Sequence, residues 1–180
     1  MRFIRSNILR FSSRQDGVAA IEVAIILPIL LLIYLATYEI SKLYSVTQRV
    51  TKIANAIGNL VAQETTITRQ NLEDLHYLAQ AMMFPYDDDA KKLSIAVSGY
   101  WIDEHAKTSI EWNWPANQVI SDEMPLSIKD RQTFIIRSAV STQYRFARFV
   151  SKTMTVPIEK IYYYRQRLAE KVKCSNCSKT

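Results

Sequence analysis

The stretch VAAIEVAIILPILLLIYLATY, residues Val18 to Tyr38, decides what kind of protein this chain is. Every residue in it is apolar or weakly polar except Glu22. Its 21 residues, at a helical rise of about 1.5 Å each, span roughly 30 Å, which is the thickness of the hydrocarbon core of a membrane. The sequence therefore predicts a transmembrane helix over residues 18–38.

The residues before this stretch indicate its orientation. Four arginines precede it, namely Arg2, Arg5, Arg10 and Arg14. Because basic residues flank the cytoplasmic end of membrane helices, we expect the N-terminus in the cytoplasm and the remaining chain in the periplasm. A cleaved secretory signal fits poorly, since the run is longer than usual, lacks a small-x-small site at its end and continues into another helical pattern. The expectation is a single-pass protein of the bacterial inner membrane.

Net charge and length indicate which partners and how many domains to expect. The formal charge of +6 could suggest an anionic partner, but residues 1–17 alone supply +3 of it. The chain has no RNP-like aromatic strand, zinc-finger spacing or basic helix, so we expect no nucleic-acid partner. With 180 residues, of which 48% are hydrophobic, the chain has room for an anchor and one modest folded domain.

Glu22 is the anomaly of the apolar stretch. A carboxylate inside a membrane segment costs on the order of 3 kcal/mol and marks a functional position by default. Its neighbours three and four residues away along a helix are all apolar: Val18, Ala19, Ile25 and Ile26. Two interpretations remain open: Glu22 extends to the cytoplasmic interface, or it has a partner on another molecule.

The residues around Glu22 resemble a known processing site. The sequence GVAAIE at residues 17–22 is similar to the site of type IV prepilins, in which a membrane peptidase cuts after a glycine and glutamate becomes the fifth mature residue. More narrowly, GVAAIEVAIILPILLLIYLATYEI resembles the TadE-like proteins, including the pair Leu27 and Pro28. The resemblance implies a leader over residues 1–17 and cleavage between Gly17 and Val18.

The resemblance also implies a role for Glu22. Cleavage would free the amine of Val18, and Glu22 of a neighbouring subunit could pair with that amine in a medium of low dielectric. Pro28 lacks an N–H and crowds the carbonyl of Ala24, so it is expected to kink the helix, unless neighbouring helices accommodate it.

The resemblance implies a minor pseudopilin rather than the major subunit. Many pilins of this group have an aromatic residue after the glutamate, where this chain has Val23, and the major Tad pilin is much shorter. A TadE- or TadF-like minor pseudopilin would initiate, cap or regulate assembly of a Tad (Flp) pilus used for surface adhesion. Its expected partners are other pilins and pseudopilins through the N-terminal helix, the prepilin peptidase, the inner-membrane assembly platform and membrane lipid.

After the membrane segment, apolar residues recur every three or four positions, which predicts an amphipathic stalk helix over residues 39–63. The expected buried stripe consists of Ile40, Leu43, Tyr44, Val50, Ile53, Ala54, Ile57, Leu60 and Val61. Residues 65–68 read as a polar turn in which Thr68 caps a second helix that ends at Pro85.

The remaining pattern predicts four strands. Apolar residues alternate from Leu93 to Ile102, from Ile110 to Trp114 and from Phe134 to Phe146, and a fourth strand is expected over residues 158–167. Trp112 and Trp114 would share one face as core or subunit-contact residues. The expected fold is α+β: a long N-terminal helix, a second helix and a small, mainly antiparallel four-stranded sheet. Residues 64–172 would form the periplasmic domain, followed by a tail over residues 173–180.

The other polar candidates do not form a catalytic or metal-binding signature, so we expect no enzyme activity, cofactor or metal. His76 and His105 are isolated, and the adjacent Asp87, Asp88 and Asp89 suit a solvated turn better than a calcium loop. Cys174 and Cys177 are expected to form a local disulfide in an oxidising periplasm. Two rival functions stay open: a membrane-anchored periplasmic binding or sensor protein, and an enzyme using His105 with Asp103 and Glu104.

Overall fold

The structure is a computed structural model that describes residues 16–86, 92–115, 124–125, 128, 132–146 and 154–177. The chain divides into two compact units, Met1–Lys42 and Leu43–Thr180, which we describe separately. Residues 1–15, which belong to the predicted leader over residues 1–17, and the acidic run Asp87–Asp89 lie outside the described residues.

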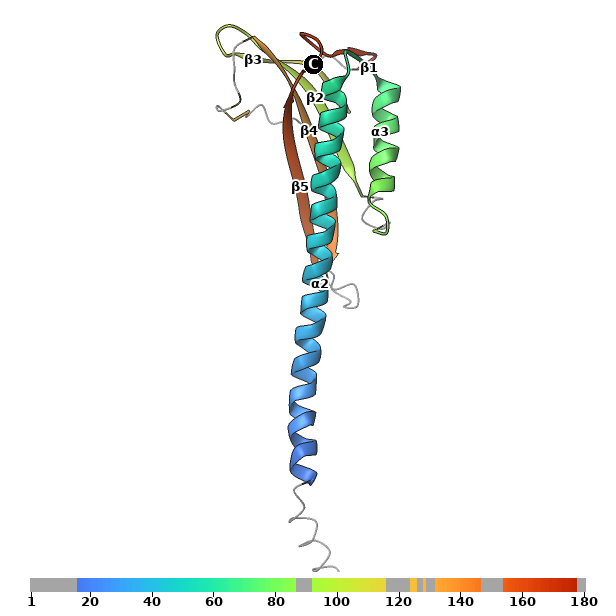
Figure 1. Cartoon of the computed structure of the whole chain (residues 1–180), viewed down its shortest axis with the longest axis vertical. Coiled ribbons are helices and arrows are strands. Elements are labelled where there is room, and N and C mark those ends of the chain that lie inside the picture. Colours follow the sequence, from blue (N-terminus) through green and yellow to red (C-terminus); the bar gives the residue numbers. More distant parts are fainter. Residues whose placement is uncertain are drawn as a thin grey trace, which may run out of the picture. The chain divides into compact units, whose positions relative to one another are not determined.

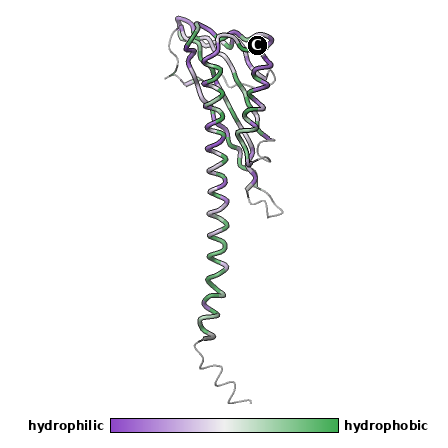
Figure 2. Tube along the Cα trace, turned by 45° about the vertical axis from the view of Figure 1, so that its right-hand side comes forward, coloured by the Kyte–Doolittle hydropathy of each residue, from purple (hydrophilic) through white to green (hydrophobic). Residues whose placement is uncertain are grey.

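The first helix, α2 (Asp16–Gln63), joins the predicted membrane and stalk helices into one element. It ends at the residue where the stalk was expected to end, and it continues as α-helix through Pro28. Figure 2 shows that the part of α2 in the first unit is almost uniformly apolar, whereas its part in the second unit mixes polar and apolar residues. The change marks the end of the predicted membrane segment.

The second unit contains the predicted antiparallel sheet. Its strands are β2 (Ser94–Ile102), β3 (Thr108–Trp114), β4 (Thr133–Phe146) and β5 (Met154–Arg165), in the order β3-β2-β4-β5. All three strand pairs are antiparallel, so the α+β fold class is confirmed. The strand β5 begins four residues before its predicted start because it includes Pro157. An edge strand tolerates a proline, since one side of it needs no backbone donor.

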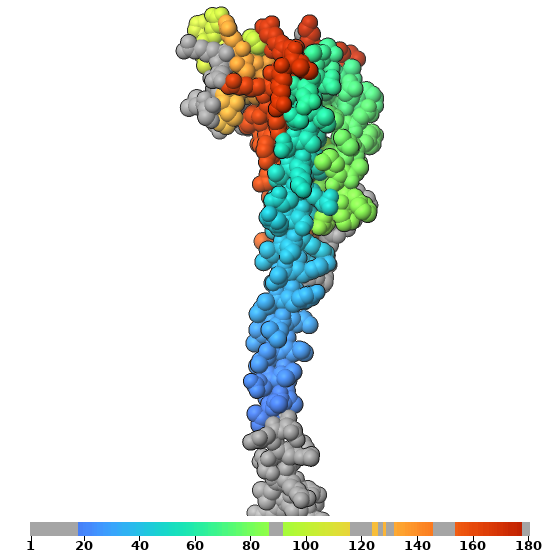
Figure 3. Space-filling view, in the orientation of Figure 1, coloured from blue at the N-terminus to red at the C-terminus, as the bar shows by residue number. Residues whose placement is uncertain are grey.

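One face of the sheet packs against the C-terminal part of α2, and α3 (Arg69–Met82) lies along that part of α2 (Figures 1 and 3). The Arg49 guanidinium of α2 donates to the Met82 carbonyl of α3 at 3.0 Å. The stripe of α2 that enters the core comprises Val46, Val50, Ile53, Ala54, Ile57, Val61 and Ala62. Trp112 and Trp114 both pack on this core, which confirms that they share a face.

The predicted stripe of α2 was too wide. Ile40, Tyr44 and Leu60 are exposed, while Val46 and Ala62, which the pattern did not include, are fully buried. A helix that packs on one sheet buries a narrow face. Apolar residues beside this buried face therefore recur every three or four positions, as the pattern requires, but their side chains do not reach the core.

Two short strands, neither of which was predicted from the sequence, lie at the end of the domain. The segment expected as a turn is β1 (Thr66–Thr68), and it pairs in parallel with β6 (Lys173–Ser175), which lies in the predicted tail. The indole N–H of Trp112 also donates to the Val172 carbonyl at 2.8 Å. The prediction of a separate tail from residue 173 was therefore wrong. Residues 173–175 show no alternation of apolar and polar residues that would predict a strand, and their pairing with the distant β1 holds them in the domain.

The contact between α2 and the sheet depends on the absence of a side chain at Gly58. A Cβ atom there would lie 2.5 Å from the ring of Tyr164 and 3.1 Å from the Cβ of Ser138. The Tyr164 hydroxyl donates to the Asn55 side chain of α2, one turn before Gly58. Burial, and next the neighbouring Tyr162, raise the pKa of Tyr164, so the hydroxyl keeps its proton at neutral pH.

We predict that Gly58→Ala destabilises the domain by about 1–3 kcal/mol, because overpacking outweighs the better helix propensity of alanine. Chemical denaturation of the full chain in detergent measures this difference. The control is Gln48→Ala, an exposed position of the same helix, which should leave the midpoint nearly unchanged. An unchanged or higher midpoint for Gly58→Ala would show that the Tyr164 ring moves aside at little cost.

Candidate functional site

The candidate site is the apolar part of α2 in the first unit. Its large side chains from Val18 to Tyr34 are exposed, and Val18 itself is 66% exposed. Among the residues that the structure describes, α2 is the one helix long and apolar enough to cross a membrane, and none of its most apolar window is buried. An exposed apolar surface of this length requires a nonpolar environment.

Glu22 lies within this surface, one helical turn after Val18. Its side chain is exposed and makes no hydrogen bond or ion pair with any residue in the described part of the chain. A carboxylate of α2 thus has apolar neighbours on its own helix and a free set of acceptor lone pairs. The arrangement can accept one cationic group from outside the helix.

Polar groups further along the same unit are satisfied within the helix. The Thr37 hydroxyl donates to the Ile33 carbonyl at 2.8 Å, and the Lys42 ammonium lies 4.4 Å from the centre of the Tyr38 ring. A tyrosine and a lysine at this position are typical of the end of a membrane helix, where the ring and the charge reach the interface. This agrees with the predicted end of the apolar segment at Tyr38.

Comparison with known families matches this region of the chain. The family of TadE-like proteins matches residues 17–57. The matched segment contains Gly17, Glu22 and Pro28, and it continues into the part of α2 that packs on the sheet. No curated protein and no solved structure matches the chain.

The match confirms the resemblance to TadE-like proteins over about a quarter of the chain. An apolar helix near the N-terminus together with this match fits a membrane-anchored protein. The four-stranded domain lies largely outside the matched residues, so its assignment rests on its own structure.

The structure does not bring the residues of the rival enzyme hypothesis together. The Asp103 carboxylate accepts from the backbone N–H groups of His105 and Lys107, at 2.9 and 2.8 Å, and so holds the turn between β2 and β3. Glu104 instead accepts from the side chain of Gln132 at 2.7 Å. The Asp103 carboxylate thus stabilises the turn, and the Glu104 carboxylate links the turn to the residue before β4.

The other polar residues that the sequence singled out make contacts typical of a folded domain rather than of a binding site. His76 of α3 shares a hydrogen bond of 3.1 Å with Gln80 and lies edge-on to the ring of Trp114. In the described ranges, no three His, Cys, Asp or Glu side chains are placed to hold a metal ion. A hollow of about 410 Å³ is lined mainly by residues of α2, and its charged residues, Arg49 and Lys52, are both basic.

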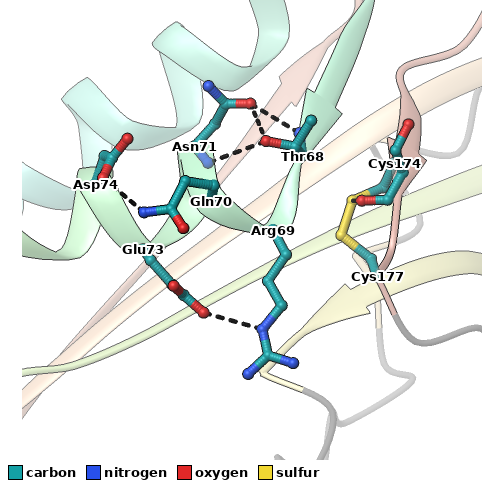
Figure 4. Close-up of polar contacts among 9 residues, drawn as sticks. Thr68, Arg69, Gln70, Asn71, Glu73, Asp74, Cys174 and Cys177 are labelled. Carbon is teal, nitrogen blue, oxygen red and sulfur yellow. Dashed lines mark hydrogen bonds and ion pairs between the residues drawn. A yellow bond between two sulfur atoms is a disulfide. The ribbon is translucent and has the colours of Figure 1, made fainter.

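Cys174 and Cys177 are joined by a disulfide, with their Cα atoms 5.6 Å apart. Figure 4 shows this disulfide on β6, near the start of α3. There the Thr68 hydroxyl accepts from the Asn71 N–H, and the Asn71 side chain accepts from the Thr68 N–H in return, as a capping box. The two cysteines also pack against the main core, so the disulfide lies in the domain rather than in a free tail.

We predict that reducing this disulfide loosens β6 and β1 but leaves the four-stranded sheet folded. The closed loop is so short that its stabilisation should be about 2 kcal/mol or less. Hydrogen exchange followed by mass spectrometry should show faster exchange around Ile67, which lies opposite Cys174, with unchanged exchange in β2 and β4.

The double variant Cys174→Ser with Cys177→Ser serves as the control for side effects of the reductant. Global unfolding on reduction, or no change at Ile67, would contradict this prediction. Alkylation of protein from the native host under non-reducing conditions tests the oxidised state itself, because free thiols would gain mass.

Proposed function

We propose that this protein is a minor pseudopilin that is anchored in the bacterial inner membrane and takes part in assembly of a Tad (Flp) pilus used for surface adhesion. The observation that carries the proposal is the carboxylate of Glu22, which has no partner in the described part of the chain and lies inside an exposed apolar helix that matches the TadE-like family. Its spacing of five residues from Gly17 supports the same assignment.

The first step of the mechanism is processing. A prepilin peptidase cuts the bond between Gly17 and Val18, and water supplies the proton and hydroxyl that complete the two new ends. Gly17 suits this step because a residue without a side chain lets the peptidase approach the backbone closely. The product keeps the apolar helix and gains a protonated amine on Val18.

The second step is association within the membrane. The Val18 amine of one subunit pairs with Glu22 of its neighbour, while Glu22 of the first subunit remains available for another contact. In a medium of low dielectric an unpaired charge is costly, so each subunit is stabilised by joining the next. The apolar surface of α2 adds packing between helices but carries no net preference over lipid by itself.

The α+β domain then lies on the periplasmic side, where it contacts other pilins or the assembly platform. The proposed partners are other pilins and pseudopilins, the prepilin peptidase, the inner-membrane platform and membrane lipid. The disulfide of Cys174 and Cys177 supports this placement, because such bonds persist in an oxidising compartment. In this proposal the protein itself makes no covalent change to any substrate.

We predict that the mature protein begins at Val18 when an active prepilin peptidase is present. Mass spectrometry of the N-terminus, on protein extracted from native membranes, measures this directly. A strain without the peptidase is the control and should retain residues 1–17. Retention of those residues in the strain with peptidase would instead favour a membrane-anchored binding or sensor protein.

We predict that Glu22→Gln leaves insertion and cleavage normal but prevents productive association. The amide keeps the size and hydrogen bonding of the side chain, but it cannot neutralise the Val18 amine. Co-purification with other pilins and the number of pili should fall more than about tenfold, which corresponds to a single lost interaction of modest strength.

The matched control is Glu64→Gln, which changes an exposed carboxylate just after α2 in the second unit and should leave piliation unchanged. Wild-type piliation in a Glu22→Gln strain without the native copy would reject the pairing role. It would return Glu22 to the interpretation in which it extends to the cytoplasmic interface.

A further inference from the structure

A row of polar residues crosses the sheet on the face away from α2. It consists of Asn113 on β3, Ser98 on β2, Arg137 on β4 and Tyr163 on β5, each directly opposite the next in register. Their chain neighbours Trp112 and Ile136 pack with α2, and side chains alternate along a strand. The four side chains therefore share the opposite face.

Three members of this row are buried with unsatisfied polar atoms. Ser98 is 0% exposed, Asn113 is 6% exposed and Arg137 is 8% exposed. Among the residues that the structure describes, the Ser98 Oγ, the Asn113 Oδ1 and the Arg137 Nε find no hydrogen-bond partner. Because buried polar atoms are nearly always partnered in folded proteins, three such atoms side by side indicate a missing group.

The charge of Arg137 indicates what kind of group is missing. A guanidinium stays charged when buried, so it needs a counter-charge. Within the described ranges, no carboxylate forms an ion pair with Arg137. The carboxylate on the same face of β5, Glu159, is exposed and lies opposite Ser141, four residues along β4 and so about 13 Å from Arg137.

On its face of the sheet, the row lies between two short side chains on one side and a small apolar cluster on the other. Next to Ser98 and Arg137, the two central strands present Ala96 opposite Ala139, both buried and both short. On the other side of the row, a small apolar cluster contains Tyr100, Ile102, Met124 and Ile135. A polar group at the row is thus surrounded by apolar side chains, where its attraction to Arg137 is weakly screened.

We propose that Arg137, Ser98 and Asn113 form a binding site for a small oxyanion, a carboxylate or a phosphate group. The guanidinium and the Ser98 hydroxyl donate to the anion's oxygens, and rotation of the Asn113 amide adds a third donor. A water molecule in the same place would satisfy the hydrogen bonds but leave the charge of Arg137 uncompensated. The charge is what distinguishes an anion site from a buried water site.

The test uses the full chain purified in detergent, with sodium phosphate or sodium acetate as the probe. Each anion is titrated at constant ionic strength against sodium chloride, and the midpoint of thermal unfolding is followed. We expect a saturable rise, about 5–10 °C at a hundredfold excess over the dissociation constant. A larger response to acetate identifies a carboxylate ligand, and a larger response to phosphate identifies a phosphate group.

Variants separate the site from general effects of salt. Arg137→Met should abolish the response, whereas Arg145→Met, an exposed arginine on the same strand and face, should keep it. Ser98→Ala should weaken binding about tenfold through loss of one charge-assisted hydrogen bond. If Arg137→Met does not fold, saturable broadening of the phosphorus NMR line of phosphate, by the wild type and more weakly by Ser98→Ala, carries the same test.

Two results would overturn the proposal. The first is that neither anion gives a saturable change in the wild-type protein by either method. The second is an equal response in the wild type and Arg137→Met, which would show that the anions act on the surface as salts.

Discussion

The contact between the C-terminal part of α2 and one face of the sheet is the interaction on which the rest of the domain depends. This contact buries the stripe from Val46 to Ala62, and α3 is positioned against the same helix. The close approach requires Gly58, because any side chain there would meet Tyr164. A second glycine, Gly99, serves the same core, since a Cβ atom at that position would lie 2.5 Å from Phe134 and 2.7 Å from Trp112. Of the chain's three glycines, two thus make room in one core and the third, Gly17, stands at the proposed cleavage site.

The sequence predicted the elements whose patterns are local. The length and hydropathy of residues 18–38, the end of α2 at Gln63 and the cap of α3 at Thr68 all depend on neighbours within a few residues. The four strands of the sheet were likewise predicted from local patterns, and short connections account for the antiparallel pairing of β2 with β3 and of β4 with β5. The pairing of β2 with β4 joins strands that are distant in the sequence. The start of β5 was missed because Pro157 reads as a break, although an edge strand accommodates it.

The features that the sequence could not predict depend on residues far apart in the chain. The strands β1 and β6 are three residues each and lie more than a hundred positions apart, so neither carries a pattern of its own. The row of Asn113, Ser98 and Arg137 could not be predicted from the sequence either, because each of these residues, taken alone, is typical of a polar position facing solvent. For the candidate site the situation is the reverse. Gly17, Glu22 and Pro28 were found by motif, while the structure adds that Glu22 has no partner in the described part of the chain.

The continuity of α2 has a mechanical consequence. The same helix supplies the membrane segment and the central stripe of the core, with no loop between them. Within the second unit, a load along α2 acts on the whole stripe of buried side chains, which must slide past the sheet together before this packing gives way. Loads of this shearing kind are shared among many contacts at once, because a close-packed interior transmits strain instead of yielding one residue at a time. The second unit can therefore resist a load on α2 through this whole interface instead of through one residue.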